Sequence, residues 1–164
     1  MTQNMTQNTL QNRCASNLQT LLPWLRYYLR GLLKAAPAGT LNINEIRILA
    51  RVFRFPGLSL QCLADDLGIH KATASIRVEQ LVEQGLLERR VNPHSRREIQ
   101  LAISPQGLSA YKQAKDYLKT HLVAQMSQFS EDELQSLEKG LGLLARMVSQ
   151  THPELGNQLA ETEI

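Results

Sequence analysis

Two short helices separated by a tight turn are predicted between residues 59 and 85. The first helix has apolar residues at helical spacing, namely Leu60, Leu63, Ala64 and Leu67. Ser59 is its predicted N-cap, because a serine hydroxyl accepts a hydrogen bond from an unpaired backbone N–H. Gly68 ends it, since glycine adopts the left-handed backbone of a sharp turn. The second helix starts after a cap at His70 and buries one side, formed by Ala74, Val78, Leu81 and Val82.

The opposite side of the second helix is small, hydroxylic and basic toward its N-terminal end. It consists of Lys71, Ala72, Thr73, Ser75, Ile76, Arg77 and Gln80. An α-helix fits the major groove of DNA, where the side chains of its first turns reach base edges. The free N–H groups and the dipole of the helix also favour phosphate. Together with His70, this side is a candidate DNA-reading surface.

A two-stranded hairpin is predicted after Gly85, with strands at 86–91 and 98–104 and a turn at 92–95. Apolar and polar residues alternate in its second strand, which is the period of a half-buried strand. No acidic residue interrupts the segment from residue 89 to residue 97, which contains Arg89, Arg90, Arg96 and Arg97. Guanidinium groups on a projecting hairpin suit phosphates and the negative potential of a narrow minor groove. The hairpin is therefore interpreted as a basic wing.

Before this segment, the apolar spacing predicts two helices. The first is a leucine-rich amphipathic helix that ends near Ala36. It either begins near Thr20, with Pro23 in its first turn, or is longer and kinks at Pro23. The second helix is predicted to be capped by Asn44 and ended by the residues 55–57. Its inward residues are predicted to be Ile46, Leu49, Ala50 and Phe53.

After the wing, Ser104 followed by Pro105 is a strong helix start. Ser130 and Glu133 form the pattern of a capping box, which predicts a break and a last helix. That helix has an apolar seam of Leu134, Leu137, Leu141, Leu144 and Val148. A small winged domain cannot cover such a seam, so we expect it to pair with the first helix of a second chain.

These elements give a mainly α fold with a small β-wing, a winged helix-turn-helix with dimerisation helices at both ends. The predicted order is a disordered polar tail at 1–14, an N-terminal dimerisation helix at 15–40 and a DNA-binding domain at 41–107. C-terminal dimerisation helices follow at 108–150, and a frayed tail at 151–164. The repeated MTQN at the start leaves either Met1 or Met5 as the true first residue.

Charge is distributed unevenly along the 164 residues, although the net charge is only +3. Residues 1–56 contain seven Lys or Arg and one acidic residue, residues 57–104 six of each, and residues 105–164 five and eight. This polarity is compatible with one DNA-facing surface. No stretch reaches the ~18 apolar residues of a membrane span, and the start does not resemble a signal peptide. We therefore expect a cytoplasmic protein without membrane contact.

Neither an enzyme nor a metal sensor is predicted. The four histidines lie in different predicted elements, and no Ser, Cys or carboxylate stands at a catalytic spacing to any of them. A metal site would need clustered Cys and His, which Cys14 and Cys62 do not provide. The sequence therefore predicts no cofactor.

Three segments carry a family resemblance: LADDLGIHKATAS, EQGLLERR and NPHSRREIQLAISPQG. In order and spacing they resemble the winged helix-turn-helix of the MarR family of bacterial transcriptional regulators. The flanking helices match too, so the resemblance covers roughly residues 15 to 150. It implies a homodimeric repressor with interlocking terminal helices, bound to a pseudo-palindromic operator in double-stranded DNA with half-sites about 10 base pairs apart. It also implies release from DNA by a small anion or an oxidant.

Site residues carry over by position. Arg97 matches the family's wing arginine that enters the minor groove, with Arg96 second, and Lys71, Thr73 and Ser75 match positions of phosphate and base contacts. Ser95 stands where the family usually has an aspartate that pairs with a wing arginine. At position 76 several relatives have a base-reading arginine. Ile76 would instead contact a thymine methyl group, and Arg77 would supply the missing charge.

An effector is expected, by resemblance, between the dimerisation body and the winged domain, and a small anionic aromatic compound would suit the residues there. The candidate neighbours are Trp24, Arg26, Tyr27, Tyr28, Arg30 and Arg51. The competing interpretation is that the aromatic residues are ordinary core or dimer contacts.

Two alternatives stay open. A peroxide-responsive branch of the family uses a first-helix cysteine that is hydrogen-bonded to tyrosines, and this sequence offers Cys14, although its position is early. Cys62 is predicted to be packed and inert. The other alternative is a dimeric protein-interaction module of the same fold without DNA binding, which the basic wing disfavours.

Overall fold

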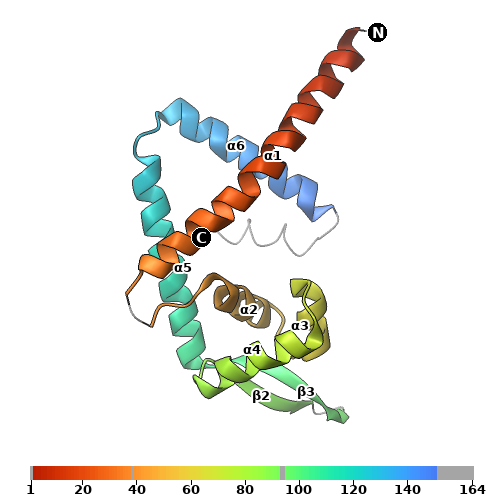
Figure 1. Cartoon of the computed structure of the whole chain (residues 1–164), viewed down its shortest axis with the longest axis vertical. Helices are drawn as coiled ribbons and strands as arrows, with labels where there is room; N and C mark the ends of the chain where they lie inside the picture. Colours follow the sequence, from red (N-terminus) through yellow and green to blue (C-terminus); the bar gives the residue numbers. More distant parts are fainter. Residues whose placement is uncertain (1, 38, 93–94, 151–164) are drawn as a thin grey trace. The chain divides into compact units, whose positions relative to one another are not determined.

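The computed structural model describes the backbone of residues 2–37, 39–92 and 95–150, and the side chains of residues 8–37, 39–91 and 100–150. The chain forms two compact units, Met1–Thr120 and His121–Ile164. The first unit contains a three-stranded sheet and helices of a winged helix-turn-helix. Figure 1 shows three helices, α2 (Ile43–Arg54), α3 (Leu60–Leu67) and α4 (Lys71–Glu83), gathered beside the hairpin of β2 (Leu87–Asn92) and β3 (Ser95–Ile103). The predicted fold class is confirmed.

The first helix, α1, runs over Thr2–Ala35 and contains Pro23 in its interior. The longer of the two predicted helices is therefore the one formed. The prediction of a disordered segment 1–14 is wrong for residues 2–14, which are helical. This segment contains neither Pro nor Gly. Because extending an existing helix avoids the cost of nucleation, polar residues with no apolar stripe still continue it.

The second helix, α2, spans Ile43–Arg54, and its N-cap is Asn42 rather than the predicted Asn44. The side chain of Asn42 accepts hydrogen bonds from the backbone N–H groups of Asn44 and Glu45 at 3.0 and 3.1 Å. The carboxylate of Glu45 in turn accepts from the backbone N–H of Asn42 at 2.8 Å. This reciprocal capping box is lost if the helix starts two residues later.

The buried side of α2 also differs from the prediction. Its buried residues are Ile48, Leu49 and Val52, whereas Phe53 is 48% exposed. The ring of Phe53 lies 6.1 Å from that of Tyr111 on the helix α5, Pro105–Met126. Leu49 belongs to both the predicted and the observed inward side, and Ile46 packs against the core without being fully buried, so the inward side is displaced by about one residue from the predicted one.

The helix-turn-helix is formed as predicted by α3, Leu60–Leu67, and α4, Lys71–Glu83. Ser59 caps α3 by accepting a hydrogen bond from the backbone N–H of Cys62 at 3.1 Å. Gly68 adopts φ 65° and ψ 38°, the left-handed conformation that favours glycine. Cys62 itself is exposed, so its predicted packing role is wrong. It lies on the solvent side of a short helix whose buried residues are Leu63 and Ala64.

The sheet has the strand order β1–β3–β2, all antiparallel. Its strands are β1, Leu58–Ser59, β2, Leu87–Asn92, and β3, Ser95–Ile103. Leu58 pairs with the second strand of the wing, in register opposite Leu101. The core lies between this sheet and the three helices. Its largest fully buried side chains are Ile48, Leu49, Val52, Leu63, Val78, Leu81, Leu87 and Leu101.

Two helices follow the wing: α5, Pro105–Met126, and α6, Glu131–Ser149. The first turns of α5 pack on the winged core through Ala114, which is 1% exposed. The predicted capping box of α6 is confirmed, with hydrogen bonds in both directions between Ser130 and Glu133. No residue of α6 is buried in the described part of the chain. The predicted frayed tail, 151–164, lies outside the described residues.

Candidate nucleic-acid interface

The outward side of α4 combines small, hydroxylic and basic side chains with one large apolar side chain. Lys71, Ala72, Thr73 and Gln80 are exposed, whereas Ser75 and Arg77 are partly buried. Ile76 stands out from them at 62% exposure. A solvent-exposed isoleucine on the outer side of a helix does not contribute to the hydrophobic core of its own chain. Its position suits contact with an apolar group of a partner, such as a thymine methyl in the major groove.

The N-terminal end of α4 is open. His70 occupies the N-cap position with an extended backbone, but its side chain makes no capping hydrogen bond. Its backbone carbonyl still accepts the first helical bond, from Ala74. The first N–H groups of the helix consequently have no side-chain acceptor from the cap, and Lys71 adds a positive charge beside them. This combination favours an anionic partner such as phosphate.

The β2–β3 ladder is irregular next to the wing turn. Val91 pairs with Ile99, whereas the next residue, Asn92, pairs with Ser95. Three residues of β3, 96–98, therefore have no partner in β2. Bulges of this kind twist a hairpin and redirect its side chains. The backbone register thus places Arg96 and Arg97 in the irregular part of the wing; their side chains lie outside the described ones.

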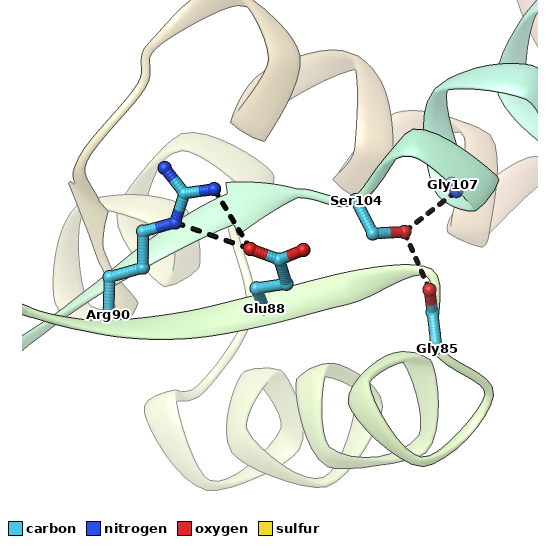
Figure 2. A network of polar contacts seen from close by, with 5 residues as sticks. All are labelled: Gly85, Glu88, Arg90, Ser104 and Gly107. Atoms are coloured by element: carbon cyan, nitrogen blue, oxygen red, sulfur yellow. Dashed lines mark hydrogen bonds and ion pairs between the residues drawn. The ribbon is translucent and has the colours of Figure 1, made fainter.

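The other two wing arginines are held by carboxylates, which reasoning from the sequence missed. Arg89 donates to Glu79 of α4 at 2.6 Å, and Arg90 donates to Glu88 at 2.9 Å. Figure 2 shows the second of these pairs, on one strand of the wing. Both pairs are exposed, so each contributes at most about 1 kcal/mol to stability. Both pairs remove free positive charge from the base of the wing, and the Arg89–Glu79 pair also ties β2 to α4.

Ser104 fixes the end of the wing to the following helix. Its hydroxyl donates to the carbonyl of Gly85 at 2.6 Å and accepts from the backbone N–H of Gly107 at 2.9 Å (Figure 2). Gly107 lies so close to Leu86 that an added Cβ would stand 2.0 Å from its carbonyl oxygen. The predicted cap at Ser104 is therefore also a tertiary link, which sets the position of the wing relative to α4.

The expected effector residues do not gather at one place. Arg26, Tyr27 and Arg30 line one side of α1 with Leu22 and Pro23. Trp24, 67% exposed, meets the ring of Tyr27 edge-on at 6.1 Å. Tyr28 is 37% exposed.

Arg51 is engaged elsewhere. It donates to Asp66 at 2.6 Å and covers the ring of Phe55 at 4.4 Å. Arg26 also faces α2 and α4, where it lines a small pocket together with Arg47 and Arg77. Arg47 was not among the predicted site residues. With Arg51 and Arg54 it forms a row of arginines along α2, and such a row does not distinguish a binding residue from an ordinary residue of a solvated helix surface.

The cysteine of the redox alternative is exposed on α1. Cys14 and Tyr27 are thirteen residues apart on this helix, which corresponds to roughly 20 Å at the helical rise. A hydrogen bond between them within one chain is therefore not possible. A redox role would need a partner for Cys14 from another chain.

Neither a metal centre nor a membrane segment is visible in the described part of the chain. No three His, Cys, Asp or Glu side chains among the described residues gather where they could hold a metal ion. Among the described helices, none is long and apolar enough to cross a membrane.

Comparison with known families and structures agrees with the fold. A protein-family sequence model described as "MarR family" matches residues 41–99, which contain α2, α3, α4 and most of the wing. The resemblance predicted from the sequence is confirmed. No curated protein matches the sequence significantly.

Solved structures extend the likeness to the flanking helices. A structure described as MarR has 23% identity and a TM-score of 0.70, covering 81% of this chain and 98% of that one. FabT from Streptococcus pneumoniae, solved in complex with DNA, has 18% identity and a TM-score of 0.64, covering 85% and 98%. PcaV from Streptomyces coelicolor, solved in complex with its natural ligand, has 17% identity and a TM-score of 0.58, covering 80% and 94%. At these identities the comparison establishes a common fold.

Proposed function

We propose that this chain, whose winged helix-turn-helix belongs to the MarR family, is a sequence-specific regulator of transcription that binds double-stranded DNA. In the proposed complex, α4 enters the major groove and the wing follows the neighbouring minor groove. Two copies bind a pseudo-palindromic operator as a homodimer, and their binding represses transcription until a small-molecule effector releases them. The protein has no enzymatic role in this proposal.

The observation that carries the proposal is the outward side of α4. Ile76 is 62% exposed and lies between hydroxylic and basic side chains. On the opposite side of the same helix, Ala74, Val78 and Leu81 are buried in the core. A helix presented in this way is rigid, and its exposed apolar residue gains from contact with a partner. The basic wing next to it adds charge suited to the DNA backbone.

The terminal helices support the homodimer. Apolar residues of α6 are 37–56% exposed, namely Leu134, Leu137, Leu141, Leu143 and Met147. On α1, Leu21, Leu22 and Trp24 are between 57% and 67% exposed. Exposure of this extent on two long helices favours burial against a second copy of the same chain. That FabT was solved with DNA and PcaV with a ligand supports both kinds of partner.

The test is selection of bound fragments from a pool of random duplex DNA by the purified protein at about 150 mM salt. We expect an enriched inverted repeat with half-site centres about 10 base pairs apart. Ile76→Ala is expected to lose the preference for thymine at one position of each half-site. Arg97→Ala should weaken binding to all sequences and flatten the salt dependence by about one unit. Arg146→Ala, which removes an exposed arginine of α6, is the matched control.

A different result of this selection would contradict the proposal. If no sequence is enriched and the weak residual binding is insensitive to Arg97→Ala, the DNA-binding proposal is wrong. The interaction module of the same fold then becomes the function to pursue. Measuring DNA affinity after stoichiometric hydroperoxide, in the wild type and in Cys14→Ser, tests the redox alternative separately. Only a loss of binding confined to the wild type would support it.

A further inference from the structure

One side of α1 forms a groove of about 590 Å³. Among the described residues, its lining comes from this helix alone, namely from Leu22, Pro23, Arg26, Tyr27 and Arg30. Leu22 and Tyr27 are both more than half exposed, so this α1 groove is open to solvent. A site for a small molecule buries about 70–90% of its ligand, whereas side chains this exposed form an open surface. The α1 groove therefore suits a peptide segment that lies along the helix.

The α1 groove combines apolar contact area with uncompensated positive charge. Arg26 and Arg30 lie one turn apart, and both are exposed. Neither is in an ion pair within the described residues, in contrast to Arg51, which pairs with Asp66 at 2.6 Å. No acidic residue precedes Glu45 in the chain, so α1 itself contains no carboxylate that could pair with them. A peptide that carries both carboxylates and aliphatic side chains is complementary to this surface.

The chain itself contains such a segment directly after α6. Residues 151–164, THPELGNQLAETEI, include three glutamates and neither lysine nor arginine. The two leucines of this segment, Leu155 and Leu159, are four positions apart, and Glu154 and Glu161 stand on either side of the pair. In charge and in apolar content, the segment 151–164 is therefore complementary to the α1 groove.

A second copy of the chain can bring this segment to the α1 groove. In the proposed homodimer, the apolar seam of α6 packs against α1 of the other copy, and the segment 151–164 continues from the end of α6. Leu22 belongs both to the groove and to the exposed apolar residues of α1, so the groove borders the proposed interface.

The length of the segment fits the groove. Residues 22 and 30 are separated by about 12 Å along the helix axis. Fourteen residues in an extended conformation span up to roughly 46 Å. The segment can therefore leave α6 of one copy and still follow the whole groove of the other.

We infer that residues 151–164 of one copy dock along the α1 groove of the other copy. Their glutamates pair with Arg26 and Arg30, and their leucines contact Leu22 and Tyr27. The exchange is mutual, because a two-fold dimer makes every contact twice. It adds ion pairs to an interface otherwise formed by apolar seams, so added salt weakens the dimer. This inference rests on the homodimer of the proposed function.

Site-specific cross-linking tests which chain fills the groove. Full-length protein with the photo-cross-linker p-benzoylphenylalanine in place of Leu159 is mixed with isotopically labelled wild-type protein. The two are allowed to exchange subunits and are then irradiated. We expect mass spectrometry to find unlabelled segment 151–164 joined to labelled peptides of α1 that contain residues 22–30. Cross-links confined to one chain, or cross-links that do not reach α1, overturn the inference.

Variants of α1 test the ion pairs through the dissociation constant of the dimer, measured by sedimentation velocity. Arg30→Gln is expected to raise it about fivefold, since exposed ion pairs are weak but each is lost twice. Arg30 is preferred to Arg26, because Arg26 also lines the small pocket between α1, α2 and α4. Arg13→Gln is the matched control, an exposed arginine of the same helix outside the groove, and should leave the constant unchanged.

The same measurement identifies the partner of Arg30. The triple variant Glu154→Gln, Glu161→Gln and Glu163→Gln is expected to weaken the dimer about fivefold to tenfold. Adding Arg30→Gln to the triple variant should then have almost no effect, because its partners have already been removed. Circular dichroism checks that every variant is folded. A full additional fivefold loss would show that Arg30 and the segment are not in contact, and the inference fails.

Failure of the inference and failure of the homodimer give different results. If the protein is dimeric but Arg30→Gln and the triple variant dimerise as the wild type does, the exchanged segment is wrong and the homodimer stands. If the wild type is monomeric at every concentration tested, the homodimer fails and the inference fails with it.

Discussion

Apolar side chains are mostly buried in the winged part of the chain and mostly exposed on its terminal helices. Among the described residues, the hydrophobic side chains classed as buried lie between Leu41 and Ala114, apart from Leu33. On α6, none is buried, and on α1 the apolar residues around Trp24 are mostly more than half exposed. The winged part therefore contains its own core, whereas in the proposed homodimer the terminal helices would gain most of their stability from packing against a second copy of the chain.

Two glycines in the two regions give the largest expected contrast. Gly107→Ala would place a Cβ 2.0 Å from the backbone carbonyl oxygen of Leu86, so we expect the winged domain to lose about 3 kcal/mol or more. Gly31→Ala on α1 meets nothing within 4 Å and is expected to stabilise the helix by about 0.5–1 kcal/mol. Urea unfolding measures both. Similar free energies of unfolding for the two variants would contradict the close packing at Gly107.

A charge on the exposed seam should separate assembly from folding. Leu141→Glu, at a position that is 54% exposed, is expected to leave the winged core intact and to shift the protein from dimer to monomer. DNA affinity should then fall about 100-fold, because a monomer contacts one half-site only. Sedimentation equilibrium and anisotropy measure the two effects. As the control, Gln135→Glu introduces the same charge at an exposed polar position of α6, and this variant should remain dimeric. A Leu141→Glu protein that is still dimeric would show that α6 does not form the dimer interface.

The link at the end of the wing predicts a moderate effect. Ser104→Ala removes the hydroxyl that is hydrogen-bonded to Gly85 and Gly107 and leaves both backbone groups unsatisfied. We expect a loss of about 1–2 kcal/mol in the free energy of unfolding. Ser109→Ala, one turn later on the exposed side of α5, should change it by less than about 0.5 kcal/mol. Equal effects in the two variants would show that the link does not stabilise the domain.

The smallest expected effect is a dependence on pH at the start of α6. Hydrogen bonds from the backbone and side chain of Ser130 hold the pKa of Glu133 below its ordinary value of 4.5. A lowered pKa means that the carboxylate stabilises the folded form above the unfolded value, and that this contribution is lost as the pH falls through the folded value. Helix content by circular dichroism should therefore fall slightly below about pH 4.5 in the wild type. Glu133→Gln should lack this step, and a step of equal size in both proteins would assign it to another group.

Local chemistry explains which features were predictable from the sequence. Ser59, Gly68 and the Ser130–Glu133 pair act on residues within four positions of themselves, so a short segment contains all the information needed to place them. The same holds for the alternation that indicated β3. The Asn42 cap was missed because two asparagines within three residues both fit the pattern of a cap. Only the geometry of the preceding loop distinguishes them.

The sequence by itself determined the order of the elements, the helix-turn-helix, the wing and the apolar seams of the terminal helices, since each follows from spacing along one segment. Tertiary structure decided which charges meet. It paired Arg89 with Glu79 and Arg51 with Asp66, and it brought Arg26, Arg47 and Arg77 to one pocket. These residues are ten or more positions apart, and the distances between their side chains depend on how helices cross around the core. Electrostatic energies change steeply over a few ångströms, so no pattern along the chain could have determined them.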